Sequence, residues 1–335
     1  MDLNQRWIIA EIGSVHDGSL GNAQKLIQAA AEAGASCVKF QTHIADAETL
    51  ADAPSPKYFS AEPRKQYFER TSFAPQQWRI LSETARSEGV TFLSSPFAIE
   101  AVEILEDVSV SAYKIPSGEI TNLPLLRRVA ETGKPVLLST GMSTWLELSA
   151  ARKIFETEAK VCLMQCTSIY PCPPELVGLN NLFEIRTRFP GTTVGFSDHT
   201  LGFAAGVAAA TLGATVIEKH FTFSRRMYGS DAKNSLEPDE FKLFTAAIRE
   251  AWMISSSPVD KDSLALDTLS DTKQIFQKSL VSAYALPRGT LLNETHFSCK
   301  KPGDGISPEC IRELVGRRLR QNVKSDHKFT WGDFE

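Results

Sequence analysis

The chain has 335 residues, of which 42% are hydrophobic and 23% are charged, and its formal net charge is -4 at pH 7. Such a chain can bury a large core, and its weak negative charge excludes the basic footprint of a nucleic-acid-binding protein. A membrane partner is excluded as well, because the sequence contains no run of about 18 apolar residues. The N-terminus lacks a signal-peptide pattern and the six cysteines form no CxxC pair, so we expect a cytoplasmic protein with reduced thiols.

Short apolar segments alternate with amphipathic ones along most of the chain. Eight segments are predicted to be strands: 6–12, 36–42, 90–96, 112–116, 135–140, 161–166, 193–197 and 215–220. Helices are predicted at 23–33, 75–88, 123–131, 146–156, 203–212 and 239–254, and glycines follow several of them. This alternation predicts a parallel sheet, and eight units over about 250 residues predict a (β/α)8 TIM barrel of the α/β class. The alternative, a doubly wound open sheet, more often has a Gly-rich phosphate turn, which EIGSVHDG is not.

The connection between the second strand and the helix at 75 is unusually long. Residues 42–74 exceed an ordinary strand-to-helix connection, and they carry Tyr58, Phe59, Tyr67 and Phe68. Aromatic side chains need burial, so we expect this insertion to be ordered. At the C-terminal end of a barrel strand it would form a lid or a wall of a substrate site.

The pattern changes after the last long helix. We expect a barrel domain at 1–255, a linker at 256–275 that includes the Ser/Pro/Asp-rich SSSPVDKDS, and a small domain at 276–335. The small domain shows short strands and tight turns. About sixty residues form a core of marginal stability, so this domain is expected to dock within the chain or on a partner.

Two of the predicted strands end in histidine. Because residues i and i+2 of a strand share a face, Ser197 points with His199, and Glu218 points with His220. Neutral imidazoles suit Mn, Zn or Fe ions, so neighbouring strands would create a metal site here, at which Glu218 could bind the metal or a metal-held water. Asp198 faces away from His199 and is expected to be structural. In the alternative, each histidine ends its strand with local hydrogen bonds.

The remaining histidines carry weaker signals. His16, after the first strand, is close enough in the expected topology to join the site. His43, His296 and His327 are expected to be surface or packing residues.

Two lysines fall inside apolar strands. Lys39 and Lys114 are costly to bury without an anion or a carboxylate partner. Several hydroxyl residues end the neighbouring strands, so we expect a pocket for a phosphate and a carboxylate. Internal salt bridges of Lys39 with Glu11 and of Lys114 with Glu119 are the alternative, and both can hold in one site.

Motifs of one family occur in order along the chain. They are IIAEIGSVHDGSLGNAQKLIQAAAEAGASCVKFQT, FLSSPF, YKIPSGEITNLPLL, LLSTGMST, CTSIYPCP, GFSDHTLG, GATVIEKHFT, GSDAKNSLEPDEF and KKPGDGISP. Over nearly its whole length the chain resembles the sialic acid (N-acetylneuraminate) synthase family, which condenses phosphoenolpyruvate with amino sugars. The resemblance implies that residues 276–335 form an antifreeze-like (SAF) β-clip domain. In the family this domain swaps across a homodimer and covers the partner's barrel mouth.

The resemblance also implies roles for individual residues. His199 and His220 would hold a divalent metal, Mn2+ first, with Mg2+ or Co2+ as alternatives. Phosphoenolpyruvate would be held by Lys39, Lys114, Ser95, Ser117, Ser139, Ser168 and Ser197. An N-acylated amino-hexose would be contacted by Gln41, Tyr170, Asp231 and, from the tail, Lys301. Glu11, Glu119 and Glu218 would be the acid/base and water-handling carboxylates.

Three positions depart from the family's usual pattern. Val15 stands where the family often has Asn, Ala232 where a His is frequent, and Lys301 where an Arg commonly reaches the sugar. These positions belong to the sugar side of the implied site. The acceptor therefore stays open among N-acetylmannosamine, its 6-phosphate and the diacetamido sugars that lead to legionaminic and pseudaminic acids.

Two other functions are compatible with the same fold. Lys114 or Lys39 could form a Schiff base in a metal-independent aldolase, although such an enzyme has no need of His199 and His220. A barrel that has lost its catalytic activity and has a carbohydrate-binding or scaffold role is the non-catalytic alternative. This alternative is disfavoured because the charged residues and histidines implied for the active site are all present in the sequence.

Overall fold

The computed structural model describes residues 1–54, 62–155 and 160–335. They form two compact units, Met1–Ser256 and Ser257–Glu335. Tyr58 and Phe59 of the predicted insertion lie outside the described residues, as does Glu156 at the end of a predicted helix.

The first unit contains a closed barrel of eight parallel strands in the order β1 to β8. These are β1 (Trp7–Gly13), β2 (Cys37–Thr42), β3 (Thr91–Pro96), β4 (Tyr113–Ile115), β5 (Val136–Ser139), β6 (Val161–Gln165), β7 (Thr193–Asp198) and β8 (Val216–His220). Since β1 pairs with both β2 and β8, the sheet has no free edge. The predicted (β/α)8 barrel is confirmed.

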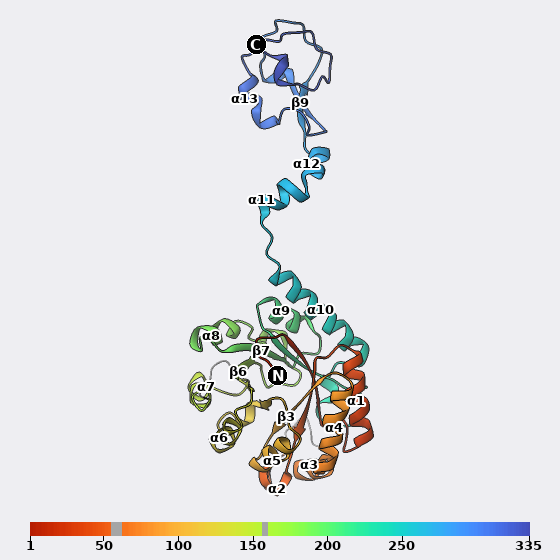
Figure 1. The fold of residues 1–335 in the computed structure, drawn as a ribbon, viewed down its shortest axis with the longest axis vertical. Coiled ribbons are helices and arrows are strands. Elements are labelled where there is room, and N and C mark those ends of the chain that lie inside the picture. The colour runs from red at the N-terminus through yellow and green to blue at the C-terminus, as the bar shows by residue number, and fades with distance from the viewer. Residues whose placement is uncertain (55–61, 156–159) are drawn as a thin grey trace. The chain divides into compact units, whose positions relative to one another are not determined.

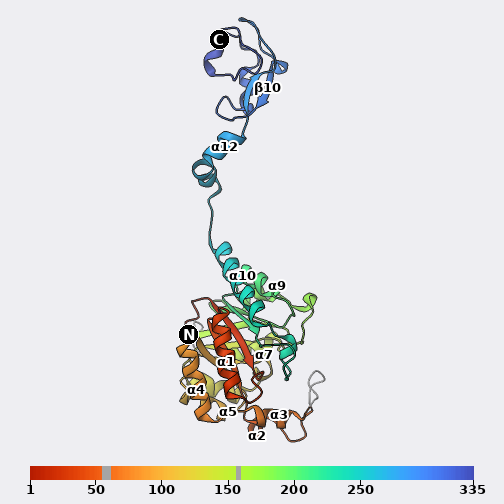
Figure 2. The ribbon, with the colours of Figure 1, turned by 90° about the vertical axis from the view of Figure 1, so that its right-hand side faces the viewer.

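Helices surround this barrel (Figure 1). They are α1 (Leu20–Glu32), α4 (Pro75–Ser87), α5 (Ile99–Asp107), α6 (Leu123–Glu131), α7 (Trp145–Arg152), α8 (Asn181–Arg188), α9 (Ala204–Thr211) and α10 (Pro238–Ser256). Gly34, predicted to end a helix, follows α1 with φ of +89°, a left-handed conformation that glycine adopts without strain. The insertion holds α2 (Ala45–Glu48) and α3 (Arg64–Thr71), which lie side by side (Figures 1 and 2). The 3-10 turns η1 (Ser117–Glu119) and η4 (Ala232–Asn234) follow β4 and β8.

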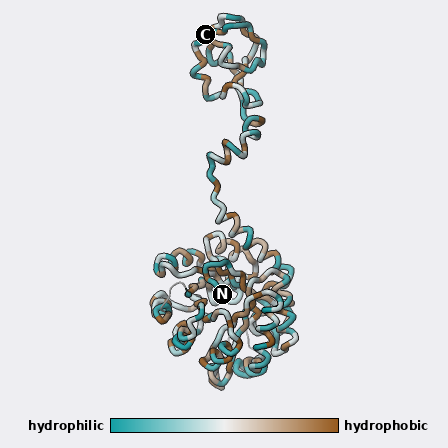
Figure 3. The backbone as a smooth tube through the Cα atoms, viewed as in Figure 1, coloured by the Kyte–Doolittle hydropathy of each residue, from teal (hydrophilic) through white to brown (hydrophobic). Residues whose placement is uncertain are grey.

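Side chains along each strand alternate between two cores. Outward residues such as Ile8, Phe40 and Phe196 pack against the helices. Inward residues near the strand starts form a separate apolar cluster, the barrel floor, consisting of Leu3, Ile9, Cys37, Leu93, Ala112, Leu137, Cys162, Met164 and Val216. Apolar segments accordingly run through the middle of the unit (Figure 3). Two residues further on, the inward positions of most strands are polar, so a polar layer lies above the floor.

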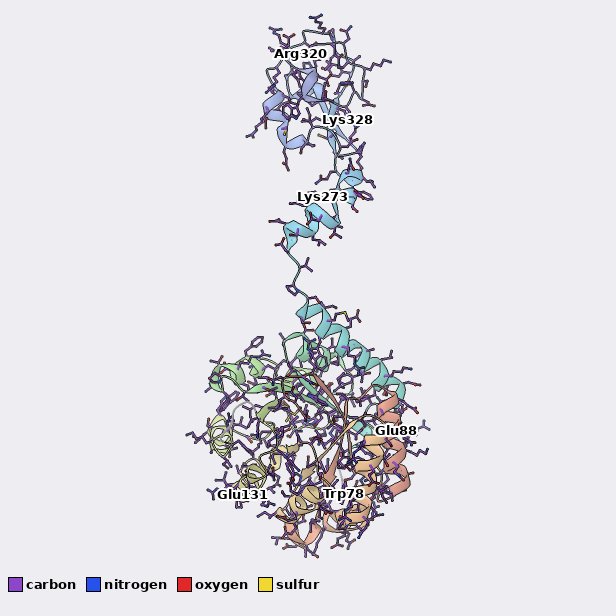
Figure 4. The ribbon with its side chains drawn as sticks, in the orientation of Figure 1. Trp78, Glu88, Glu131, Lys273, Arg320 and Lys328 are labelled. Atoms are coloured by element: carbon purple, nitrogen blue, oxygen red, sulfur yellow. The ribbon has the colours of Figure 1, made fainter. Side chains whose placement is uncertain are left out.

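The second unit is built around an antiparallel pair, β9 (Ser279–Ser282) and β10 (Phe297–Lys300). Its core contains Leu280, Leu314 and Phe329, and α13 spans Ile311–Leu314. The predicted linker contains α11 (Lys261–Ser263), a π-helical turn (Leu264–Thr268) and most of α12 (Ser270–Phe276). Charged side chains project from this unit, including Lys273, Arg320 and Lys328 (Figure 4). Among the described residues, no helix is long and apolar enough to cross a membrane.

Candidate active site

A cavity of about 380 Å³ lies at the C-terminal ends of the barrel strands, where catalytic residues of this fold gather. With the exception of Lys301, every predicted site residue lines it: Glu11, Lys39, Gln41, Ser95, Lys114, Ser117, Glu119, Ser139, Ser168, Tyr170, Ser197, His199, Glu218, His220 and Asp231. Lys301 belongs to the second unit, where its ammonium lies 4.8 Å above the Phe276 ring.

A bulge in β1 shapes one side of the cavity. The register against β2 shifts between Glu11 and Gly13, and Gly13 has φ of +53°. A Cβ at this position would lie 2.7 Å from Asp231 Oδ2 and 3.1 Å from Gln41 Nε2. Glycine is therefore required here, both for its backbone conformation and for the close approach of two site residues.

Two buried lysines of the polar layer are paired with carboxylates. Lys39 Nζ lies 2.7 Å from Glu11 Oε2, and Lys114 Nζ lies 2.9 Å from Glu218 Oε1. Glu218 Oε1 also lies 3.8 Å from Lys39 Nζ and accepts a 3.0 Å hydrogen bond from Ser197 Oγ. The two pairs therefore form one network across the inside of the barrel.

These pairs fix the charges of the layer. Burial alone would raise the pKa of Glu218, but the ammonium groups of Lys114 and Lys39 outweigh it and hold this pKa below its usual value. Burial likewise opposes the charge on Lys39, yet Glu11 and Glu218 together raise its pKa. Lys39 and Glu218 are thus both charged at neutral pH, and an anionic ligand must compete with carboxylates for the lysine.

The predicted salt bridge between Lys39 and Glu11 is confirmed, but the one between Lys114 and Glu119 is wrong. Lys114 points inward toward β8, whereas Glu119 follows on η1 and accepts a 2.8 Å hydrogen bond from Asn122 Nδ2. Burial raises the pKa of the Glu119 carboxyl. Glu119 therefore retains a proton to higher pH than an exposed glutamate does.

His199 and His220 converge from neighbouring strands, with ring centroids 5.7 Å apart. His199 Nδ1 donates to the carbonyl oxygen of Thr167 at 2.8 Å. Its Nε2 is left as an acceptor, 3.3 Å from the Tyr170 hydroxyl. Burial lowers the pKa of His199 to about 3, so the ring is neutral at physiological pH.

This pair of imidazoles fits a divalent metal ion. Within the described residues His220 Nδ1 is buried without a hydrogen-bond partner, and it lies 3.9 Å from Asp231 Oδ2. An unsatisfied buried nitrogen is costly, and coordination would satisfy it. Across residues 1–54, 62–155 and 160–335, no cluster of three or more His, Cys, Asp or Glu suits a metal. Two imidazoles would therefore leave coordination positions for substrate or water.

A buried ion pair outside the cavity supports His199. Lys219 Nζ lies 3.0 Å from Asp198 Oδ2 and donates to the carbonyl oxygen of Thr200 at 2.5 Å. Asp198 Oδ1 accepts from the Thr200 N–H at 2.9 Å. These contacts fix the turn that carries His199, and Asp198 has the structural role expected for it.

Hydroxyl groups gather around the loop after β5. The Gly141 N–H donates to Ser117 Oγ at 3.1 Å, and Ser117 Oγ lies 3.3 Å from Cys166 Sγ. A Cβ on Gly141 would come 2.7 Å from Cys166 Sγ and 2.9 Å from Ser117 Oγ. The same Cβ would also meet Ser168 Oγ, so the backbone is close to two hydroxyls, those of Ser117 and Ser168, that can donate to anionic oxygens.

The described part of the insertion forms a wall of the cavity, as predicted. Arg64, Tyr67 and Phe68 of α3 line it. Arg70 of the same helix contacts Asp17 of the loop after β1 at 2.5 Å, and its guanidinium lies 5.3 Å from the ring of Tyr228 after β8. The wall is therefore fastened to two barrel loops.

His16 differs from its prediction, and His43 has a position that the sequence predicted only in part. His16 does not join the site: its ring lies 4.5 Å from that of Phe73, and its Nδ1 accepts from the Gly18 N–H. His43 is buried and packs between Phe68 and Phe97, as one of the two predicted alternatives has it, but it also lines the cavity. The alternation of β2, continued one residue past the end of the strand, is the signal that could have placed His43 on the same side as Gln41.

Two of the departures from the family pattern do not reach the cavity. Val15 and Ala232 are buried in the outer core, between barrel and helices. Their effect on a ligand is therefore indirect, through packing of the loops after β1 and β8.

A closed (β/α)8 barrel with charged side chains paired inside its C-terminal end defines a barrel enzyme. Residues 26–260 match the NeuB family, and residues 277–335 match the SAF domain. The chain belongs to the NeuB family, and the resemblance predicted from the sequence is confirmed.

Individual relatives agree with this assignment. The chain is 36% identical over 330 residues to N,N'-diacetyllegionaminic acid synthase of Campylobacter jejuni subsp. jejuni. The aligned region covers 95% of this chain and 97% of that protein. It is 34% identical over 327 residues to human N-acetylneuraminate-9-phosphate synthase, with 96% and 90% covered. The crystal structure of N-acetylneuraminic acid (sialic acid) synthetase from Leptospira borgpetersenii serovar Hardjo-bovis superimposes with a TM-score of 0.70 at 26% identity, covering 81% of this chain and 94% of that one.

Proposed function

We propose that the protein condenses phosphoenolpyruvate with an N-acylated amino-hexose to give a nine-carbon sugar acid and inorganic phosphate. The observation that carries the proposal is the pairing of buried Lys39 and Lys114 with Glu11 and Glu218 inside the cavity. A small donor with a carboxylate and a phosphate can replace these internal partners. The synthase names of the relatives support the same class of reaction.

In this reaction C3 of phosphoenolpyruvate forms a bond to the aldehyde carbon of the open-chain sugar. Positive charge develops at C2, water adds there with loss of a proton, and the C2–O bond to phosphate breaks. Lys39 and Lys114 hold the donor with Ser95, Ser117, Ser139, Ser168 and Ser197, so catalysis rests on positioning and electrostatics. We assign the exchange of the water proton to Glu119, because it lines the cavity with Asn122 as its hydrogen-bond donor, whereas Glu11 and Glu218 are paired with lysines. Burial raises the pKa of Glu119, in keeping with this role. Glu11 and Glu218 face the developing positive charge.

A divalent metal, Mn2+ first with Mg2+ or Co2+ as alternatives, would be held by His199 and His220 and would polarise the sugar aldehyde. The chain's contribution is to orient these rings and to keep that of His199 neutral by burial. Thr167 fixes the tautomer of His199. Gln41, Tyr170 and Asp231 line the same region and are assigned to the sugar.

A Schiff-base aldolase is the less favoured function. A nucleophilic lysine must lose its charge, whereas the neighbours of Lys39 raise its pKa, and Lys114 is held by both oxygens of Glu218. Borohydride reduction in the presence of pyruvate tests this directly. A stable adduct on Lys39 or Lys114 would replace our proposal with the aldolase.

The quaternary part of the proposal is a homodimer in which the second unit and its Lys301 act at the partner's cavity. Exposed apolar side chains support it, because Leu266 and Phe276 are 66% and 63% exposed. A partner subunit would bury such residues.

Release of phosphate from phosphoenolpyruvate with Mn2+ tests the function. The acceptors are N-acetylmannosamine, its 6-phosphate and the diacetamido precursors of legionaminic and pseudaminic acids, each with and without a chelator. Release with one acceptor, abolished by the chelator, is the expected result. Phosphate release that persists in the chelator would overturn the metal assignment. If none of the four acceptors gives phosphate release, the proposed class of acceptor is wrong.

A further inference from the structure

A chain of hydrogen bonds links the insertion to the cavity through His43. His43 Nδ1 lies 2.7 Å from Glu48 Oε1 of α2, and its Nε2 lies 3.1 Å from Gln41 Oε1. Gln41 Nε2 donates to Glu11 Oε1 at 2.8 Å, and Glu11 pairs with Lys39. The array therefore begins outside the cavity, at Glu48, and ends on the proposed donor site.

The chemistry of this array determines where its protons lie. Glu11 pairs with the Lys39 ammonium and accepts from Gln41, so the group of Gln41 that faces it is the NH2. The other end of the amide, which faces His43, is then the carbonyl, also an acceptor. Glu48 on the opposite side of the ring accepts as well. Both ring nitrogens of His43 then face acceptors, an arrangement that an imidazolium satisfies with two N–H donors.

The surroundings of His43 suit a cation. The ring is stacked between Phe68 and Phe97, with centroids 3.7 Å and 4.1 Å away, and aromatic faces attract cations. Glu48 Oε2 is buried and has no hydrogen-bond partner among the described residues, which leaves its charge to His43. Other titratable groups that interact with this cluster are Glu119 of η1, Arg64 of α3 and His16 of the loop after β1, and burial lowers the pKa of His16 to about 3.

Gln41 faces the side of the cavity assigned to the sugar. Its Nε2, Glu11 Oε1 and Asp231 Oδ2 all lie within 3.4 Å of the position that a Cβ on Gly13 would occupy. An amide nitrogen carries two protons, and only one of them is used on Glu11. The second is available to a sugar oxygen.

We propose that His43, held as an imidazolium by Glu48, is a positioning residue that locks the Gln41 amide with its NH2 group toward Glu11 and the acceptor sugar. The sugar as ligand rests on the proposed function. Without the Nε2 donor of His43 the Gln41 amide can flip, so that its oxygen and NH2 group exchange places. Its carbonyl would then face the Glu11 carboxylate, and these two acceptors repel each other. His43 and Glu48 thus set the hydrogen-bond polarity of the acceptor site without touching the reacting atoms.

His43→Phe tests the positioning role, because phenylalanine keeps the aromatic stack and removes both donors. One lost hydrogen bond corresponds to about a tenfold change in affinity. The KM for the acceptor should rise about tenfold, while the KM for phosphoenolpyruvate stays within about twofold. An unchanged acceptor KM, or an equal rise in both KM values, would overturn the proposal.

Chemical rescue separates hydrogen bonding from packing. His43→Ala leaves a slot between Phe68 and Phe97 that added imidazole can enter. The matched pair of ligands is 4-methylimidazole, which donates from both nitrogens when protonated, and 1-methylimidazole, which has only one N–H. The 4-methyl isomer should lower the acceptor KM and the 1-methyl isomer should not. Equal rescue by both would show that His43 acts by packing alone.

A readout independent of turnover keeps this inference distinct from the proposed function. In a 15N-histidine spectrum of the full-length protein, assigned by comparison with His43→Phe, His43 should show two protonated ring nitrogens. A neutral His43 ring would overturn the inference even if the enzyme is active. If no acceptor releases phosphate but the ring is doubly protonated, the proposed reaction fails and the His43 array stands.

Discussion

At the scale of single residues, the polar layer depends on charges that neutralise one another. Glu218 receives both Lys114 and Ser197, and its pKa is held low although burial acts in the opposite direction. Removal of one cation should therefore change the protonation state of the carboxylate as well as the affinity for an anion.

Lys114→Met tests this dependence. It removes a cation from the proposed donor site and leaves Glu218 with Lys39 at 3.8 Å as its remaining cation. We expect kcat/KM for phosphoenolpyruvate to fall at least about 100-fold, since a lost charge-assisted contact costs about 3 kcal/mol or more. Lys134→Met is the matched control, because this lysine pairs with Glu106 away from the cavity. Similar losses in both variants would contradict the role of Lys114.

His220→Ala tests the metal assignment. It removes the imidazole whose Nδ1 has no hydrogen-bond partner in the described part of the chain, and a small cavity is left. Activity should fall at least about 100-fold, and calorimetric Mn2+ binding should be lost together with it. Circular dichroism should remain that of the wild type. Full activity in metal-stripped His220→Ala protein would refute the assignment.

At the scale of elements, the pleat of the strands explains what the sequence could predict. Because alternate residues share a face, the inward positions of Lys39 and Lys114 follow from apolar neighbours on either side. The partner of Lys114 could not be predicted, since Glu218 is 104 residues away and meets it only after the barrel closes. His43 was missed because its burial depends on how α3 folds back and places Phe68 on the ring.

The turn after β7 offers a test at the same scale. Lys219→Met leaves Asp198 charged, buried and without its ion-pair partner, which costs about 3–5 kcal/mol of unfolding free energy. The double variant Asp198→Asn, Lys219→Met removes both charges and should recover a large part of this loss. Urea unfolding monitored by circular dichroism measures both. Equal stability of the single and double variants would show that the buried charge is not the cause.

At the scale of the whole molecule, the two units have separate cores. The barrel unit buries its own outer core and floor, and the second unit has its own apolar cluster. The boundary between the units follows Ser256. The barrel should therefore fold without the C-terminal domain, although the proposed reaction draws on both.

Deletion of residues 276–335 tests this division. The truncated protein should keep a cooperative thermal transition, while the KM for the acceptor rises or turnover falls at least about tenfold. Full-length Lys301→Ala is the matched variant that removes one tail side chain and leaves the rest. If the truncated protein turns over normally, the tail has no part in the site.

The barrel floor has a consequence for how this sequence can change over time. Several barrel strands each have a floor residue, which holds the barrel together, at one inward position. The next inward position, two residues further along, carries a residue assigned to chemistry. Substitutions in the floor that conserve total volume are tolerated by packed cores, and they leave the layer above in place. Evolution or protein engineering can thus change thermal stability and reactivity almost independently in each of these strands. The pairs of floor residue and site residue are Ile9 and Glu11, Cys37 and Lys39, Leu93 and Ser95, Leu137 and Ser139, and Val216 and Glu218.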